Sequence, residues 1–146
     1  MNKDKRIVVR VRGIVLHENE LLGVRHPHNL NFIALPGGHL EWGEDVKECL
    51  QREITEELGI NPEIGRLLYV YNFIENDTQS VEFLFEITNS SEFKNIDNVE
   101  RTHPHEIAEV CWVKSNDERI LLPKIVWEDF KKGDIISDKI RYINNK

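Results

Sequence analysis

The strongest constraint on this chain is a glycine-rich loop, LPGGHLEWGED, that opens directly into a predicted helix. We expect the helix from about Glu44 or Asp45 to Leu58, because acidic residues stand in its first turn and Gly59 follows its last. Apolar residues recur at every fourth position along it and form a stripe that should face a core. The stripe consists of Val46, Leu50, Ile54 and Leu58. The segment therefore predicts a packed helix whose preceding loop can approach a ligand closely.

Three carboxylates crowd the flank of this helix. Glu53, Glu56 and Glu57 fall within roughly a 100-degree arc beside the apolar stripe, so they should be partly buried. Like charges at this spacing destabilise a helix by a few tenths of a kcal/mol per pair in water, and by more where solvent is scarce. Arg52 could relieve one charge, whereas a hard divalent cation could relieve all three. The alternative is a solvated glutamate-rich face, but the adjoining loop favours metal-assisted phosphate chemistry.

Length and charge limit the classes of function. The chain has 146 residues and no dividing linker, so we expect residues 1–146 to form a single domain with its own core. Its net charge of -7 argues against loose, charge-driven binding to nucleic acid. Cys49 and Cys111 form no CxxC pair, and neither a secretory leader nor an apolar run of membrane length is found. These features predict a cytoplasmic protein without a membrane partner.

The rest of the chain reads mostly as strands. Strands over 6–16 and 21–25 should form a hairpin across the HENE turn, and FIAL predicts a strand ending near Leu35. RLLYVYNFIE and SVEFLFEIT should be strands that flank an NDTQ turn, EIAEVCWV should be another strand, and PKIVWEDFKK a second helix. The sixteen residues SSEFKNIDNVERTHPH show no periodicity, and a loop of that length is usually functional or mobile.

The loop and helix together resemble the Nudix box. The chain is similar to that motif at every defined position, which are Gly38, then after five residues Glu44, and then after seven residues the run REITEELGI. The resemblance implies the Nudix fold, an α/β (α+β) arrangement in which a mixed β-sheet is sandwiched between α-helices. It also implies an enzyme that uses Mg²⁺, or Mn²⁺ in its place, while water cleaves a nucleoside diphosphate linked to another group.

The same resemblance assigns roles to residues of the box. The implied catalytic residues are Arg52, Glu53, Glu56 and Glu57. The three glutamates would bind the metal together with the backbone carbonyl of Gly37, and in several relatives the first of them also acts as the base. Glu44 looks like the ion-pair partner of Arg52, which would fix the helix against its loop and is support rather than chemistry.

Other residues are expected to complete the site. Many relatives take a further metal-ligating glutamate from outside the box, for which Glu106 is the first choice and Glu100 and Glu82 follow; a solvated surface glutamate is the alternative for each. Arg25 could bind phosphate oxygens, with a surface ion pair as its alternative. His39, at a variable position of the box, resembles relatives that act on nucleoside triphosphates. The expected substrate contacts are Arg25, Gly38 and His39.

Two further patterns have less specific interpretations. The sequence HPH occurs at 26–28 and at 103–105, which suggests zinc, although loops at the rim of a pocket are the favoured interpretation. Four aromatic residues could stack a base, although aromatic residues on strands are more often part of a core. They are Phe32, Tyr69, Tyr71 and Phe73.

The expected activity is the hydrolysis of a normal or oxidised nucleoside triphosphate with release of pyrophosphate. The alternatives are an ADP-ribose or nucleotide-sugar pyrophosphatase, a sensor of the same fold that binds nucleotide without turnover, and a scaffold in which the helix is only structural. Sensors usually carry a damaged box, and the intact box here favours the enzyme. The expected partner is a small-molecule nucleotide, and many relatives also form homodimers.

Overall fold

The computed structural model of this chain describes residues 4–96, 107 and 109–146. Its elements, in chain order, are β1 (Arg6–Ile14), β2 (Leu16–His17), β3 (Glu20–His26), β4 (Asn29–Ala34), β5 (Gly37–His39), α1 (Val46–Leu58), β6 (Ile64–Glu75), β7 (Thr78–Ile87), the 3₁₀ helix η1 (Ser90–Phe93), β8 (Glu109–Val113), β9 (Leu121–Leu122), α2 (Lys124–Lys132) and β10 (Arg141–Asn144).

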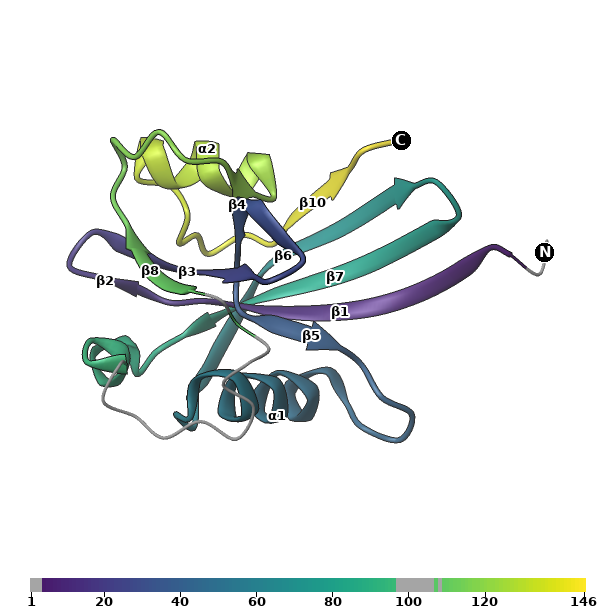
Figure 1. Cartoon of the computed structure of the whole chain (residues 1–146), viewed down its shortest axis with the longest axis horizontal. Helices are drawn as coiled ribbons and strands as arrows, with labels where there is room; N and C mark the ends of the chain where they lie inside the picture. The colour runs from purple at the N-terminus through teal and green to yellow at the C-terminus, as the bar shows by residue number, and fades with distance from the viewer. Residues whose placement is uncertain (1–3, 97–106, 108) are drawn as a thin grey trace.

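The strands form two mixed sheets that lie between the two helices (Figure 1). The first sheet has the order β10-β6-β7-β1-β5, in which β1 is parallel to β7 and β10 is parallel to β6. In the second sheet the order is β2-β3-β4-β9, and β8 also pairs with β3. Helix α1 lies on one side of these sheets and α2 on the other, as Figure 1 shows. The predicted mixed sheet between helices is therefore confirmed.

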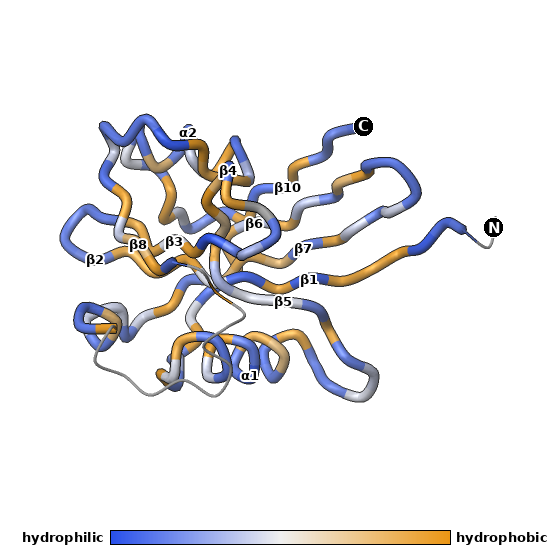
Figure 2. The backbone as a smooth tube through the Cα atoms, viewed as in Figure 1, coloured by the Kyte–Doolittle hydropathy of each residue, from blue (hydrophilic) through white to orange (hydrophobic). Residues whose placement is uncertain are grey.

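Alternating side chains on the strands build a core on each side of the first sheet. Val11 of β1 packs in one cluster with Leu50 and Ile54 of α1. Leu84 of β7 packs in the other with Trp127 of α2. Figure 2 shows hydrophobic residues concentrated on the strands, while the β6–β7 turn and the loop before α1 are largely hydrophilic. Each fully buried aliphatic side chain contributes about 1.5–3 kcal/mol, so these clusters fix both helices against the sheet.

Helix α1 begins and ends where the sequence predicts. The carboxylate of Asp45 accepts hydrogen bonds from the backbone amides of Lys47 (2.7 Å) and Glu48 (3.1 Å), which caps the first turn. Gly59 ends the helix in the left-handed region with φ 74°. Its apolar stripe is buried as expected, apart from Val46, which is only partly covered. No helix among the described residues is long and apolar enough to cross a membrane.

The predicted first hairpin is only partly correct. Its turn is present, because β2 and β3 pair antiparallel across Glu18 and Asn19. The expected strand over 6–16 instead breaks at the buried Val15, and its longer part, β1, joins the other sheet beside β7. Nine residue pairs align β1 with β7, whereas only two pairs join β2 to β3 in the hairpin. Most of the segment 6–16 therefore belongs to the long-range pairing with β7.

The other expected elements are placed as follows. The strands on either side of the NDTQ turn are β6 and β7, the strand over CWV is β8, and PKIVWEDFKK contains α2. Within the long aperiodic stretch, residues 90–93 form η1, in which Phe93 is buried. Most of that stretch lies outside the described residues.

Candidate functional site

The glycine loop is held tightly against β1 and α1. Gly37 lies opposite Arg12 with φ +152°, and a Cβ there would stand 1.9 Å from the carbonyl oxygen of Val11. A Cβ on Gly38 would stand 2.3 Å from Cδ of Glu53. Only glycine fits at Gly37, because a Cβ there would meet backbone, whereas a Cβ on Gly38 would push the carboxylate of Glu53 out of its place. The loop thus brings its backbone directly against one of the predicted metal ligands.

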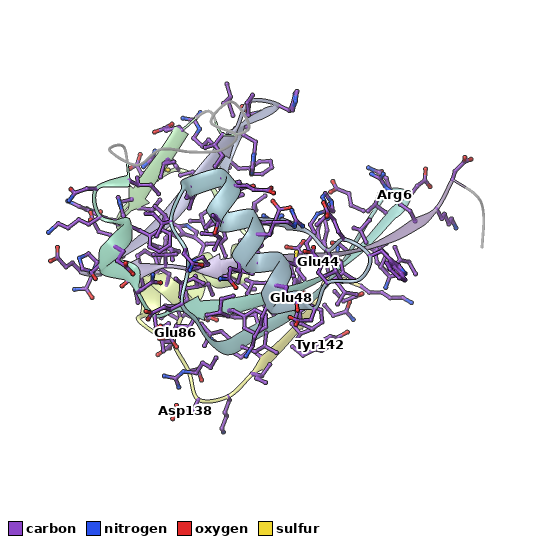
Figure 3. The ribbon with its side chains drawn as sticks, turned by 90° about the horizontal axis from the view of Figure 1, so that it is seen from below. Arg6, Glu44, Glu48, Glu86, Asp138 and Tyr142 are labelled. Atoms are coloured by element: carbon purple, nitrogen blue, oxygen red, sulfur yellow. The ribbon has the colours of Figure 1, made fainter. Side chains whose placement is uncertain are left out.

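Arg52 connects the loop to the acidic helix. Its guanidinium forms a two-point contact with Glu44, from Nη2 to Oε1 at 2.7 Å and from Nε to Oε2 at 3.1 Å. Nη2 also donates to the backbone carbonyl of His39 at 3.1 Å. This interaction lowers the pKa of Glu44 to about 2, chiefly through the hydrogen bond from Arg52, and raises the pKa of Arg52. The predicted ion pair is present, and Figure 3 shows Glu44 on the loop that enters the helix.

The three helix glutamates differ in exposure, as their position beside the apolar stripe predicts. Glu57 is 5% exposed, while the side chains of Glu53 and Glu56 are 15% and 31% exposed. Arg52 lies 2.8 Å from Glu53 and 3.5 Å from Glu56, so it relieves two of the three charges rather than the one expected. The predicted partial burial is confirmed.

The donor chemistry of this helix suits a hard divalent cation. Three carboxylates on one flank, next to the backbone of a glycine loop, are the oxygen ligands such ions prefer. Within the described part of the chain, no group of three His, Cys, Asp or Glu side chains is arranged around a single point. Arg52 holds Glu53 and Glu56 toward itself, and a cation would therefore compete with the guanidinium for these two carboxylates.

A cavity of about 530 Å³ lies on the α2 side of the first sheet. Phe32, Tyr71 and Phe73 line it, and the rings of the last two are 5.6 Å apart between centroids. Tyr69, the fourth predicted stacking residue, is instead fully buried and donates a hydrogen bond to Asp129 at 2.6 Å. Three of the four aromatic residues thus form one surface that a flat ring could stack against.

Charged residues of β1 and β7 form another part of this cavity. Glu82 is 5% exposed, and its carboxylate accepts from Nε of Arg12 at 2.7 Å and from the Ser80 hydroxyl at 3.3 Å. Arg10 lies on its other side, 4.0 Å away. Arg10 and Arg12 are not among the residues predicted for the site, although the alternation in RIVVRVRG places them on one face of a strand. Glu82, a third choice for the extra metal ligand, is engaged by arginines in this structure.

The remaining predicted residues fall into two groups. Nε2 of His39 accepts a hydrogen bond from Nε of Arg10 at 3.2 Å, and burial followed by the nearby arginines lowers the pKa of this imidazole. Arg25 forms an ion pair with Glu109 at 2.8 Å, the alternative considered for it, and its role toward phosphate stays a prediction. The expected residues that lie outside the described part of the chain are Glu100, Glu106, His103 and His105.

A hollow of about 690 Å³ is larger than the aromatic cavity but lies elsewhere. It is formed by residues 115–122 and by α2, and none of its lining residues belongs to β1, β5 or α1. The smaller cavity is the better candidate for a substrate, because Arg10 and Arg12 lie opposite His39 and Gly37 in the pairing of β1 with the glycine loop.

The family model described as NUDIX domain matches residues 7–132. The chain belongs to the Nudix family. It is accordingly a pyrophosphohydrolase that acts on phosphoric anhydride bonds, and Nudix hydrolases generally use a divalent metal.

Similar proteins have several different substrates. The ADP-ribose pyrophosphatase of Methanocaldococcus jannaschii is 29% identical over 127 residues, with 83% of this chain and 75% of that protein covered. The 8-oxo-dGTP diphosphatase of Escherichia coli is 33% identical over 63 residues, with 40% and 48% covered. The crystal structure of a MutT NUDIX hydrolase from Burkholderia pseudomallei has a TM-score of 0.67 and 22% identity, covering 87% of this chain and 98% of that one, which supports the fold.

Proposed function

We propose that this Nudix hydrolase cleaves a nucleoside triphosphate, normal or oxidised, and releases pyrophosphate. The observation that supports this proposal best is the connection between the aromatic cavity and the acidic helix. Strand β1 carries Arg10 and Arg12 into the cavity, and the same strand pairs with β5, whose Gly38 packs against Glu53. A base in the cavity and phosphates extending toward the helix would use both parts of one site.

The cavity offers the chemistry that a nucleotide needs. Phe32, Tyr71 and Phe73 provide faces for stacking, which is worth about 1–3 kcal/mol per base where it has been measured. Arg10 and Arg12 supply positive charge in a protein whose net charge is -7, with Glu82 balancing one of them. Phosphate oxygens would thus meet a locally cationic surface before they reach the carboxylates of α1.

The chain's residues then position the reacting groups. A divalent metal, when bound by Glu53, Glu56, Glu57 and the Gly37 carbonyl, would neutralise the phosphates and favour attack by water. Arg52 fixes the helix against the loop through Glu44, so the carboxylates keep their place relative to the Gly37–Gly38 backbone. Water forms a bond to phosphorus, the anhydride P–O bond breaks, and the proton from the water passes to a helix carboxylate.

ADP-ribose is the second candidate substrate, because the relative with that activity aligns over 83% of this chain. A hydrolysis screen with Mg²⁺ or Mn²⁺, in which chromatography measures the nucleoside monophosphate that each substrate yields, would separate the candidates. It should include normal and oxidised nucleoside triphosphates, ADP-ribose, nucleotide sugars and dinucleoside polyphosphates. Turnover highest on a triphosphate supports the proposal, turnover highest on ADP-ribose selects the alternative, and nucleotide binding without any turnover identifies a sensor.

The helix assignment has its own test. Glu57→Gln should lower turnover by at least the roughly 10²-fold that loss of an electrostatic stabiliser costs, while the fold survives. The matched control is Glu48→Gln, an exposed glutamate on the first turn of the same helix, which should keep near-normal activity (Figure 3). Equal activity of Glu57→Gln and the wild type would remove the metal-site assignment. A rise in stability with no other change would indicate a purely structural helix.

A further inference from the structure

Two arginines on the same face of β1 have different hydrogen-bonding environments. Arg12 is bound to the protein through two of its guanidinium nitrogens, since Nε donates to Glu82 at 2.7 Å and Nη1 donates to the Leu35 carbonyl at 3.0 Å. Leu35 directly precedes the PGG sequence of the loop. Arg12 therefore ties the centre of the first sheet to the beginning of the glycine loop, which is a structural task.

Arg10 is held at only one end of its guanidinium. Nε donates to Nε2 of His39 at 3.2 Å, while the nearest carboxylate oxygen of Glu82 is 4.0 Å from Nη1, beyond hydrogen-bond distance. Among the described residues, neither Nη nitrogen of Arg10 has a hydrogen-bond acceptor. The side chain is 23% exposed and lines the cavity beside Tyr71 and Phe73. A partly desolvated cation with unused donors next to aromatic faces is suited to a ligand that has both an anionic group and a flat ring.

His39 fixes the direction of this cation. It lies opposite Arg10 in the antiparallel pairing of β5 with β1, so the two side chains share one face of the sheet. By accepting from Nε, the imidazole leaves the two Nη groups as the free edge of the guanidinium. The carbonyl of His39 is itself held by Arg52 at 3.1 Å and by the Cys49 thiol at 3.3 Å, so the acceptor is attached to the acidic helix.

We infer that Arg10 binds a phosphate oxygen of the nucleotide and that His39 is a positioning residue that orients Arg10. This inference rests on the proposed function, because it takes the aromatic cavity to be the place where the nucleoside binds. It separates the two arginines by role, with Arg10 recognising the substrate and Arg12 supporting the loop.

The test compares nucleosides with their 5′-monophosphates in the presence of EDTA, so that no divalent metal ion can bind the phosphate. Calorimetric titrations of adenosine, AMP, guanosine and GMP give the gain in affinity that the phosphate provides. In Arg10→Gln this gain should fall by about 10- to 100-fold, the value of a charge-assisted hydrogen bond, while affinity for the nucleoside stays the same. A residue that only supports the fold would change the affinities of nucleoside and monophosphate together.

Arg6→Gln is the matched control. It removes the same charge from the same strand, four residues or about 13 Å from Arg10 along β1. Arg6 donates a hydrogen bond to Thr78 and does not line the cavity. At an ionic strength of about 0.15 M the screening length is about 8 Å, so the control should bind both ligand types like the wild type. If Arg10→Gln does not fold, Arg10→Lys provides the same comparison, because it keeps the charge but cannot form both contacts and should lose part of the gain.

Variants of His39 test the positioning role. His39→Gln retains an acceptor and should keep most of the phosphate gain, whereas His39→Leu should lose a part of it. The double variant that combines His39→Leu with Arg10→Gln should bind the monophosphates as well as Arg10→Gln alone does, since the imidazole acts only through the arginine. Additive losses would show that His39 acts independently and would overturn this part of the inference.

The outcomes distinguish this inference from the proposed function. Hydrolysis of a nucleotide by the wild type, with no effect of Arg10→Gln on the phosphate gain, leaves the proposed function standing and refutes the role of Arg10. If Arg10→Gln loses the affinity that the phosphate provides, but the wild type hydrolyses nothing in the substrate panel, the role of Arg10 stands and the proposed function is refuted. Absence of binding of all four ligands to the wild type also refutes the inference.

Discussion

Replacing Glu44 with glutamine should destabilise the protein by about 1–3 kcal/mol at pH 7. The structure gives this carboxylate two hydrogen bonds from Arg52, at 2.7 and 3.1 Å, and one from the Glu41 amide at 2.8 Å. Its pKa falls from 4.5 to about 2, which corresponds to an upper limit of roughly 3 kcal/mol. Because the two side chains are 14% and 25% exposed, solvent screening reduces this value toward the lower part of the range.

The effect of this substitution should depend on pH in a defined direction. The pKa of Glu44 is depressed in the folded state, so its stabilisation is fully present above 4.5 and is lost as the pH falls toward about 2. The difference in unfolding free energy between Glu44→Gln and the wild type should therefore be constant from pH 7 to about 5 and shrink below that.

Urea unfolding followed by circular dichroism at several pH values between 7 and 3.5 measures this difference. Glu41→Gln is the matched control, because Glu41 is 69% exposed and lies 3.8 Å from the same guanidinium. Removing such an exposed pair should change stability by less than about 0.5 kcal/mol. An effect of Glu44→Gln no larger than that of the control, or one that does not decrease with acid, would refute the claim that this ion pair fixes the helix against its loop.

Three further results are expected. Gly38→Ala should lower turnover by at least about tenfold at near-normal stability, because the added Cβ would displace Glu53. Steady-state kinetics and thermal melts measure the two quantities, and unchanged turnover would contradict the prediction. Tyr69→Phe should lower the unfolding free energy by about 1–2 kcal/mol, because it removes the hydrogen bond of 2.6 Å from the tyrosine hydroxyl to Asp129. Urea titrations measure this change, and a loss below about 0.3 kcal/mol would show that the bond contributes little. Mg²⁺ should raise the melting temperature of the wild type but not of Glu57→Gln; equal shifts would place the cation elsewhere.

Local signals in the sequence sufficed to predict the helix and much of its chemistry. Capping by Asp45 and termination at Gly59 are decided by a few neighbouring residues, and the period of the apolar stripe decides which flank carries the glutamates. The pairing of Glu44 with Arg52 was instead implied by the resemblance to the Nudix box, and the structure contains this ion pair. The single domain, the homodimer, the cytoplasmic location and the roles of individual site residues stay predictions.

Features that depend on distant pairing were missed. Strand β5 has the sequence GGH, which carries no strand signal of its own and is extended because β1 lies beside it. The cluster formed by Arg10, Arg12 and Glu82 requires β1 to pair in parallel with a strand 70 residues later. Nothing in either segment alone specifies that partner, although the alternation of charged and apolar residues along β1 could have indicated an arginine-bearing face.

Parallel pairing of β1 with β7 also sets the order in which this molecule can fold. The nine aligned pairs close a loop of about 70 residues, and the pairing of β10 with β6 closes another of similar length. Contacts between such distant segments form slowly, because the entropy of the intervening chain is lost before they stabilise anything. We therefore expect α1 and the β6–β7 hairpin to form early, and the cationic side of the cavity only when the first strand of the chain docks. During synthesis β1 therefore cannot pair with β7 until residue 87 has left the ribosome.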